Sequence, residues 1–262
     1  MQKTHDFPVD VVPVFAKTSF SINEANGYRE IKNRSAVVRT DTNEALGIVS
    51  TKYQLLKHAD VVNGFRKALA NERFTETIKV AKNGAQLYAT YSLPEHMVEI
   101  RPNDHVSLQF IVKNSYDGTN SLHIMLGAFR LVCTNGMIIG KRFSTFTQKH
   151  VGSEAEAIDA GKLKGKVESI TAQFQKTLPM MQTMAATPVT IDPDELFDFK
   201  QLHLPRYLVK LAAEEYTNAH DQSLWGFYNA LTWAITHHMK RESPATEIGY
   251  LTAAWSAATK GL

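Results

Sequence analysis

The chain has 262 residues and a mass of 29.3 kDa, enough for one large domain or for a core with an appended helical region. Apolar residues make up 44% and charged residues 21%, which excludes a disordered or fibrous chain, and the formal net charge is only +3. The single cysteine, Cys133, excludes an intramolecular disulfide and a zinc site built from cysteines, and without a secretory signal or a membrane-length apolar window we expect a cytoplasmic protein.

Residues 1–27 contain proline, asparagine and glycine without a hydrophobic period, and we interpret them as an irregular N-terminal arm. The period becomes two in residues 35–50, where β-branched runs flank a polar tetrapeptide, which predicts a β-hairpin. A short amphipathic helix is expected to begin at His58. Its apolar face consists of Val61, Val62, Phe65 and Leu69.

A second hairpin is predicted in residues 77–91, because the pair Asn83-Gly84 supplies the positive φ angles that tight turns require. A third pair of strands is expected over residues 106–112 and 121–132, across a loop with the turn signal Asp117-Gly118. Hairpins join antiparallel neighbours. The sequence therefore predicts an α+β fold in which three hairpins with one inserted helix form a mostly antiparallel sheet.

A long helix packed on this sheet is expected from the N-cap Ser153 to about Leu178, because apolar residues recur on one face. Pro179 is expected to end this helix, and the methionine-rich segment 180–184 to follow it as a connector. Further helices are predicted over residues 205–216, 224–239 and 247–260. The expected organisation is an arm at 1–27, an α+β core at 28–179 and a helical C-terminal region at 180–262.

Sequence motifs for catalysis are missing. The chain has no G-x-x-x-x-G-K loop and no G-x-G-x-x-G after a predicted strand, so neither nucleotide hydrolysis nor dinucleotide redox chemistry is supported. The adjacent His237 and His238 face different sides of a helix, and Cys133 lacks a matching catalytic arrangement of His with Asn or Asp. We therefore expect no catalytic residues, no metal and no cofactor.

The positive charge is concentrated in the middle of the chain. The counts of Lys and Arg against Asp and Glu are 13 and 11 in residues 1–100, 10 and 6 in 101–180, and 6 and 9 in 181–262. Segment 141–150 mixes cations with two phenylalanines, which suits single-stranded nucleic acid because cations follow the phosphates and rings stack on unpaired bases. The same segment also fits a solvated loop whose phenylalanines pack into the core.

Four stretches of the sequence together resemble a known family. They are Leu46-Gly-Ile-Val-Ser-Thr-Lys-Tyr53 with the helix 58–69, Lys113-Asn-Ser-Tyr-Asp-Gly118, the strand 127–136, and Leu224-Trp-Gly-Phe-Tyr-Asn-Ala-Leu-Thr232. In this order they resemble the phage/plasmid-like proteins, a group of unknown function, over residues 30 to about 240. Members of that group usually carry His where Tyr116 stands here. The resemblance implies a mobile genetic element in a bacterial host cell, without an established activity.

The order of hairpins and helices is also similar, at the level of fold, to the single-strand annealing recombinases of the RecT and Erf superfamily. Those proteins form rings or filaments, hold DNA in a basic groove and need no ATP. This similarity implies an oligomeric protein that anneals single-stranded DNA, with a phage or host nuclease or single-strand binding protein as a further partner. The expected phosphate contacts are Lys113, Arg130, Lys141, Arg142, Lys149 and Lys164. The expected base contacts are Phe143 and Phe146.

A second hypothesis is a protein-interaction module that binds or inhibits a host protein and has no affinity for DNA. Its expected contact surface is the methionine-rich segment 180–184, since methionines adapt to varied partners. The alternative interpretation of these methionines is the edge of a hydrophobic core. The basic centre of the chain favours nucleic acid over this second hypothesis.

Overall fold

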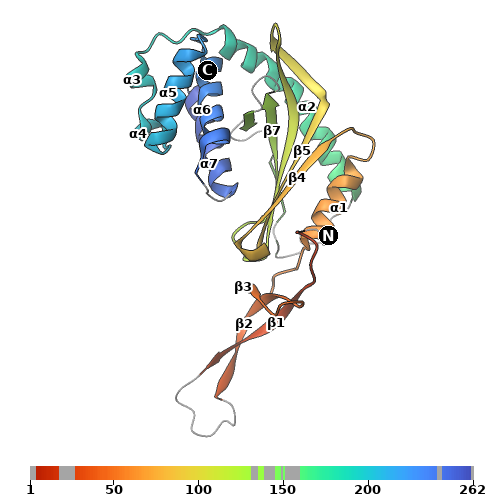
Figure 1. Ribbon diagram of the computed structural model, residues 1–262. Coiled ribbons are helices and arrows are strands. Elements are labelled where there is room, and N and C mark those ends of the chain that lie inside the picture. Colours follow the sequence, from red (N-terminus) through yellow and green to blue (C-terminus); the bar gives the residue numbers. More distant parts are fainter. Residues whose placement is uncertain are drawn as a thin grey trace.

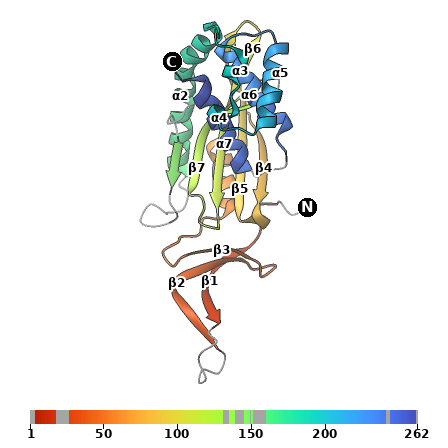
Figure 2. The same cartoon turned by 90° about the vertical axis from the view of Figure 1, so that its left-hand side faces the viewer.

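The computed structural model describes residues 4–17, 27–130, 135–138, 145–148, 150, 160–240 and 244–260. Figures 1 and 2 show a larger part, in which a sheet lies among helices, and a narrower three-stranded sheet that extends from one end of it. The fold is α+β with antiparallel pairing, as predicted. The predicted N-cap Ser153 and the residue Cys133 lie outside the described residues.

The three-stranded sheet contains β1 (Val9–Lys17), β2 (Tyr28–Arg39) and β3 (Ala45–Ser50) in this order. The predicted hairpin of β2 and β3 is confirmed. The interpretation of residues 1–27 as an irregular arm is wrong for β1, which pairs antiparallel with β2. Prolines suggested irregular structure, but Pro13 lies on an edge strand beside a register shift, where a missing N–H is tolerated.

The main sheet has the order β4-β5-β6-β7-β8, and β9 also pairs with β7. Its strands are β4 (Thr75–Ala81), β5 (Gln86–Arg101), β6 (Asp104–Ser115), β7 (Leu122–Arg130), β8 (Asn135–Ile138) and β9 (Thr145–Gln148). The expectation that the first hairpin joins this sheet is wrong. The backbone edge of β7 is paired instead by β8 and β9, which align with different halves of that strand.

The turns of the main sheet show the predicted glycine chemistry. Between β4 and β5 the short 3-10 helix η1 (Lys82–Gly84) places Asn83 at φ 56° and Gly84 at φ 101°. The turn between β6 and β7 places Gly118 at φ 72°. These positive φ angles are the ones for which Asn and Gly are the favoured residues.

Helices α1 (His58–Ala68) and α2 (Ala160–Ala186) contact the strands of the main sheet. Their buried faces are the predicted ones, with Val61 and Phe65 in α1 and Ile170 and Phe174 in α2. The expectation that the helix ends at Pro179 is wrong, because α2 continues through this exposed proline.

The burial pattern explains why α2 continues. Met181 and Met184 extend the buried face of the helix and are fully buried, so their packing outweighs the hydrogen bond that a proline removes. They belong to the core rather than to an exposed contact surface, which corrects the surface expected for the second hypothesis. The predicted boundary between 179 and 180 therefore falls inside a helix.

The C-terminal region is helical, as predicted. It contains α3 (Pro193–Leu196), α4 (Phe199–Leu202), α5 (Arg206–Asn218), α6 (Leu224–His238) and α7 (Pro244–Ala258). Helix α6 is buried along most of its length between its neighbours α5 and α7, and both α6 and α7 contact β8. Figure 1 shows these helices on the opposite side of the sheet from α1 and α2. None of the helices in the described ranges is long and apolar enough to cross a membrane.

We predict that Gly47→Ala destabilises the contact between the two sheets. A Cβ atom at Gly47 would lie 2.8 Å from the Tyr116 carbonyl oxygen and closer still to Asp117 Cα, and both of these atoms belong to the backbone. The free energy of unfolding should fall by about 1–3 kcal/mol, the usual cost of overpacking. Urea titration followed by circular dichroism measures this change.

The matched control is Gly165→Ala, because a Cβ atom at this helical glycine meets nothing within 4 Å. This control should raise the free energy of unfolding by about 0.5–1 kcal/mol through helix propensity. Equal stability of the two variants would contradict the predicted close approach.

Candidate nucleic-acid interface

Most of the predicted basic segment falls in ranges that the structure does not describe. Lys141, Arg142, Phe143 and Lys149 lie outside the described residues. The backbone of Phe146 belongs to β9, and its side chain is not among those described. The role of this segment therefore stays a prediction.

Arg130 does not offer a free cation to a phosphate. Its guanidinium holds the buried Asp104 carboxylate through Nε at 2.6 Å and Nη2 at 2.7 Å, and only 14% of the side chain is exposed. The indole Nε1 of Trp225 donates to the same carboxylate at 2.9 Å. Burial would raise the pKa of Asp104, but Arg130 and Trp225 hold it below its ordinary value. The sequence suggested Arg130 as a phosphate contact, whereas in the structure its charge is paired with the buried Asp104 and stabilises the core.

The two other described candidates differ in exposure. Lys113 is half-buried on β6, and burial lowers the pKa of its ammonium group. Lys164 is exposed on α2. The pairs Lys113–His123 and Val106–Arg130 lie at opposite ends of the β6–β7 ladder, about 23 Å apart along the strand. The structure therefore does not gather Lys113 and Arg130 into one site.

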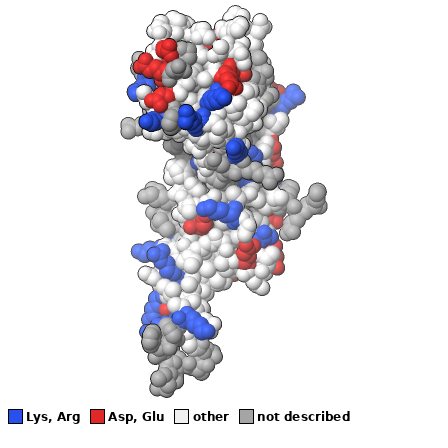
Figure 3. Space-filling model, turned by 60° about the vertical axis from the view of Figure 1, so that its left-hand side comes forward, with Lys and Arg blue, Asp and Glu red and all other residues white. Residues whose placement is uncertain are grey.

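A different basic surface lies on the three-stranded sheet. We define the basic ribbon as residues 15–17 of β1 together with residues 28–34 of β2, which form the end of this sheet farthest from the helices (Figures 1 and 2). Two large aromatic side chains are exposed there, Phe15 at 57% and Tyr28 at 56%. Figure 3 shows Lys and Arg side chains along this narrow part of the molecule.

Strand register places the aromatic rings together. Phe15 pairs with Glu30 and Lys17 pairs with Tyr28, so Phe15 and Tyr28 are diagonal neighbours on one face of the ribbon. Lys17, which pairs with Tyr28, lies on the same face, as does Glu30, and residues 31–34 of β2 follow at the register shift opposite residues 13–15 of β1. This face therefore combines two exposed rings with Lys17 and Glu30, and the other cations of the ribbon lie next to it along β2.

The charges of the basic ribbon are largely unpaired. Its cations are Lys17, Arg29, Lys32 and Arg34, against the single carboxylate of Glu30. Among the described residues, these cations have no ion-pair partner, in contrast to Arg39 at the base of β2, which pairs with Asp41. Exposed and unpaired cations are what a phosphate backbone neutralises on binding.

The sequence did not predict this surface, because β-branched residues, which indicate a strand, recur within residues 28–50 only from Ser35 onward. The signal was present in Tyr28-Arg-Glu-Ile-Lys-Asn-Arg34, where four of seven residues are cationic or aromatic and the apolar residue Ile31 is isolated. Such a stretch forms a strand exposed on both faces only when a neighbouring strand pairs with it. That neighbour is β1, which lay in the supposed arm.

Tyr116 connects the basic ribbon's sheet to the main part. Tyr116 belongs to a second hydrophobic cluster, which contains residues from both parts of the molecule. The members of this cluster are Phe7, Val9, Val37, Leu46, Val49, Ala85 and Tyr116. The ring of Tyr116 stacks on His58 at a centroid distance of 3.8 Å, and its hydroxyl accepts a hydrogen bond from the His58 backbone N–H at 2.7 Å.

His58 is fully engaged at this contact. Its Nε2 donates to the Gly84 carbonyl oxygen at 3.0 Å, and its Nδ1 accepts from Asn114 Nδ2 at 3.0 Å. Burial lowers the pKa of His58 to about 3. With both nitrogens occupied and the ring neutral, His58 serves as a structural support and has no free nitrogen for acid–base chemistry.

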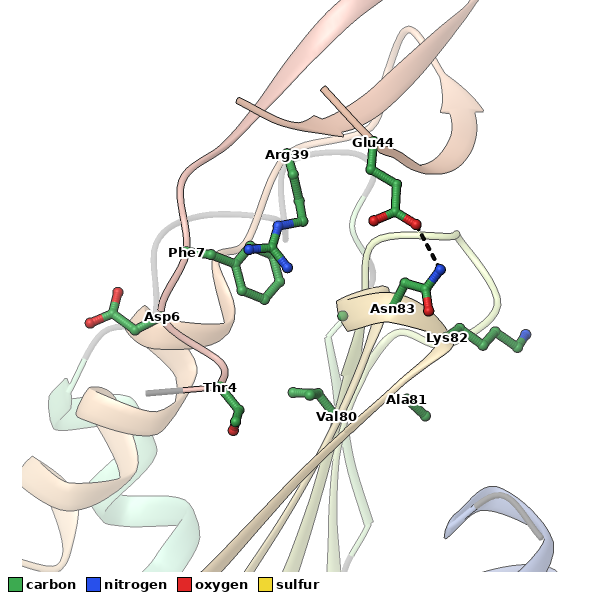
Figure 4. A pocket seen from close by; sticks show the side chains of 10 residues that line it. Thr4, Asp6, Phe7, Arg39, Glu44, Val80, Ala81, Lys82 and Asn83 are labelled. Atoms are coloured by element: carbon green, nitrogen blue, oxygen red, sulfur yellow. Dashed lines mark hydrogen bonds between the residues drawn. The ribbon is translucent and has the colours of Figure 1, made fainter. Parts of the chain in front are cut away.

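A groove of about 810 Å³ borders this contact (Figure 4). Three of its charged side chains have partners: the Arg39 guanidinium lies 4.1 Å from the Phe7 ring centroid, Glu44 accepts from Asn83 Nδ2 at 2.6 Å, and the third is Lys82. Lys82 reaches Asp117 at 3.3 Å. These contacts stabilise the junction of the two sheets. Among the described residues, no group of three or more His, Cys, Asp or Glu is placed to hold a metal.

We predict that His58 makes stability depend on pH. The unfolded state takes up a proton near pH 6.5, whereas folded His58 does so only near pH 3. Between these values the free energy of unfolding should therefore fall as pH falls, by up to about 1.4 kcal/mol per pH unit. Urea titrations between pH 7 and pH 4 should show a smaller slope for His58→Gln.

The exposed His238 provides the control, because His238→Gln leaves the buried imidazole in place and should keep the wild-type pH slope. Indistinguishable pH slopes for wild type and His58→Gln would refute the assignment.

Comparison with known proteins identifies the family. Residues 45–255 match the family described as Domain of unknown function (DUF932). The UPF0380 proteins YfjQ and YafZ of Escherichia coli (strain K12) are each 24% identical over 149 residues, which is 52% of this chain and 52% of the relative. The chain spans about half the length of these relatives, and no solved structure matches it.

These matches support the resemblance to a family of unknown function and add no support to the recombinase analogy. The matched region begins at β3 and extends into α7, so it includes the whole main sheet. The chain belongs to the DUF932 family.

Proposed function

We propose that this protein binds single-stranded nucleic acid through the basic ribbon and promotes annealing of complementary DNA strands without ATP. The observation that carries the proposal is the face on which Phe15 and Tyr28 are exposed beside unpaired cations. Aromatic faces stack on bases only where those bases are unpaired, and cations follow the phosphates between them. A face of this composition therefore favours single strands over duplexes.

Annealing requires that a bound strand keep its pairing edges accessible. A ribbon exposed on both sides holds a strand by its phosphates and base faces and does not enclose it. The hydrogen-bonding edges of the bases then stay available to a second strand. Lys164 on α2 is a further exposed cation, and segment 141–149, most of which lies outside the described residues, would add to it.

Several copies are part of the proposal. One basic ribbon offers only four cations, and contacts repeated in a ring or filament convert weak binding per subunit into useful affinity. Strands β1 and β3 are the outer strands of their sheet, which leaves backbone edges for pairing with another copy. A nuclease or a single-strand binding protein of phage or host remains the further partner proposed from the sequence.

The alternative, a protein-interaction module, now rests on a different surface. Met181 and Met184 are buried, whereas Phe15, Tyr28 and Ile48 are exposed on the three-stranded sheet. A protein partner would use these apolar side chains without needing the unpaired cations. The charge of the ribbon favours nucleic acid over this alternative.

We predict that Lys17→Gln with Lys32→Gln weakens binding and makes it less sensitive to salt. Removing one phosphate contact should reduce the slope of log affinity against log salt by about 0.7 for a single strand, so the double variant should reduce it by about 1.4. Fluorescence anisotropy with a labelled single-stranded oligonucleotide, titrated between about 25 and 200 mM salt, measures this slope.

The matched control removes two exposed lysines from the C-terminal region, Lys200→Gln with Lys210→Gln, and should leave the slope unchanged. The pair Phe15→Ala with Tyr28→Ala should weaken binding at least about tenfold by removing two stacking faces. The proposal is overturned if the wild-type protein does not bind at low salt, or if the ribbon double variant and the control double variant bind equally well.

Annealing is predicted to follow from binding. Mixing complementary labelled oligonucleotides with the protein, in the absence of ATP, should shorten the half-time of duplex formation, and the ribbon variants should lose this effect. Mass measurement should show rings or filaments that grow when single-stranded DNA is added. A monomer that leaves the annealing rate unchanged would support the protein-interaction module instead.

A further inference from the structure

A second cavity, of about 390 Å³, lies where the three-stranded sheet meets the turn between β6 and β7. We call it the junction pocket. Its volume is at the lower end of the range for small-ligand sites, which suits one nucleoside and excludes a duplex. The residues used below are Arg34, Val49, Tyr53, Asp117, Asn120 and His150, all of which line it.

His150 supplies an unused acceptor to the junction pocket. The residue is only 7% exposed, and its Nε2 is buried without a hydrogen-bond partner in the described part of the chain. The ring lies against that of Tyr53, with centroids 4.9 Å apart and planes tilted by 31°, and the His150 carbonyl oxygen accepts a hydrogen bond from the Gln54 N–H at 2.7 Å. A buried imidazole nitrogen without a partner is costly, and a ligand that donates an N–H would satisfy it.

The ring of His150 is neutral. Burial lowers its pKa, and a hydrogen bond to the backbone of Gln54 only partly offsets that effect. The groups that face it on neighbouring elements include the Tyr53 hydroxyl, which donates to the Ser115 carbonyl oxygen at 2.8 Å, so this hydroxyl is not available to His150. Nε2 therefore presents a lone pair toward donors.

Asp117 adds a fixed negative charge to the same wall. Its carboxylate accepts hydrogen bonds from Gln86 Nε2 at 2.9 Å and from the Thr119 backbone N–H at 3.0 Å, and the exposed Lys82 pairs with it at 3.3 Å. Burial would raise the pKa of Asp117, but these donors, with the Thr119 hydroxyl, keep it below its ordinary value. A ligand edge with carbonyl oxygens is disfavoured beside this carboxylate, whereas an amino group is favoured.

Arg34 links the junction pocket to the basic ribbon. It is exposed on β2, lines the pocket, and has no ion-pair partner among the described residues. Ile48, which is exposed, and Val49, which is buried, add apolar side chains to the lining. A cation, apolar side chains and an unpartnered acceptor in one pocket together fit a planar heterocycle joined to a phosphate.

We propose that the junction pocket takes one base of the single strand that the basic ribbon binds, and that it prefers cytosine to thymine. The cytosine amino group would donate to His150 Nε2, and the adjoining phosphate would lie on Arg34. At the position of this amino group thymine presents the O4 carbonyl oxygen, which cannot donate to His150 Nε2, and thymine carries an additional C5-methyl group. This inference rests on the proposed binding of single strands.

The test compares oligo(dC) and oligo(dT) of equal length by fluorescence anisotropy. Wild type should bind oligo(dC) about three- to tenfold more tightly, the contribution of one hydrogen bond. His150→Phe keeps a ring against Tyr53 but removes the acceptor, so it should abolish the preference while retaining the affinity for oligo(dT). His150→Gln, which restores an acceptor, should recover part of the preference.

A measurement on the wild-type protein avoids reliance on the folding of these variants. With ¹⁵N-labelled histidine, the Nε2 resonance of His150 should shift on addition of oligo(dC) and much less with oligo(dT). The base pocket is overturned if both oligonucleotides bind with equal affinity and that resonance does not move. The binding function itself fails only if neither oligonucleotide binds at low salt, which is a separate result.

The ribbon double variant separates the preference for a base from the overall affinity for a single strand. Lys17→Gln with Lys32→Gln should weaken the binding of both oligonucleotides by the same factor and leave the ratio of their affinities unchanged, because neither residue lines the junction pocket. A ratio that changes with this double variant but not with His150→Phe would place base preference on the ribbon and overturn the inference.

Discussion

The contact of His58 with Tyr116 determines how the two parts of the molecule are joined. Tyr116 stacks on His58 with one side of its ring and meets Phe7 edge-on at 6.2 Å, and the apolar side of the three-stranded sheet packs around it. His58 is in turn fixed by Gly84 and Asn114. The basic ribbon and the junction pocket both belong to the sheet that this contact holds in place, so their positions depend on it.

A charged residue in the sequence need not place its charge on the surface of the folded protein. Arg130 and the cations of the basic ribbon are indistinguishable by residue type, but Arg130 neutralises the buried Asp104, whereas Lys17 and Lys32 have no carboxylate to neutralise among the described residues. A buried ion pair is stabilised by its partner and by excluded water, and neither is visible in composition. Net charge by segment therefore points to the centre of the chain, whereas a cluster of exposed cations without ion pairs among the described residues lies near its beginning, on β1 and β2.

Local patterns predict the elements that have a strong period. The face of α1 with Val61 and Phe65, and the turn at Asn83-Gly84, follow from spacing and from backbone sterics alone. The continuation of α2 past Pro179 could not be predicted in this way, because it depends on the burial of Met181 and Met184 against elements remote in sequence. For the same reason the sequence alone does not predict β1, because an edge strand that contains a proline can be identified only from the strand with which it pairs.

The candidate site is harder to predict than the fold, because both of its parts combine residues from distant segments. In the junction pocket, Arg34 comes from β2, Asp117 from the turn after β6 and His150 from beyond β9. The match to the DUF932 family covers Asp117 and His150 but begins after Arg34 and the ribbon strands. The proposed base pocket and the proposed phosphate-binding ribbon are thus separable in sequence. Arg34 is the residue that they share, because it belongs to the ribbon and lines the pocket. Its position would align a strand held by the ribbon with the acceptor at His150.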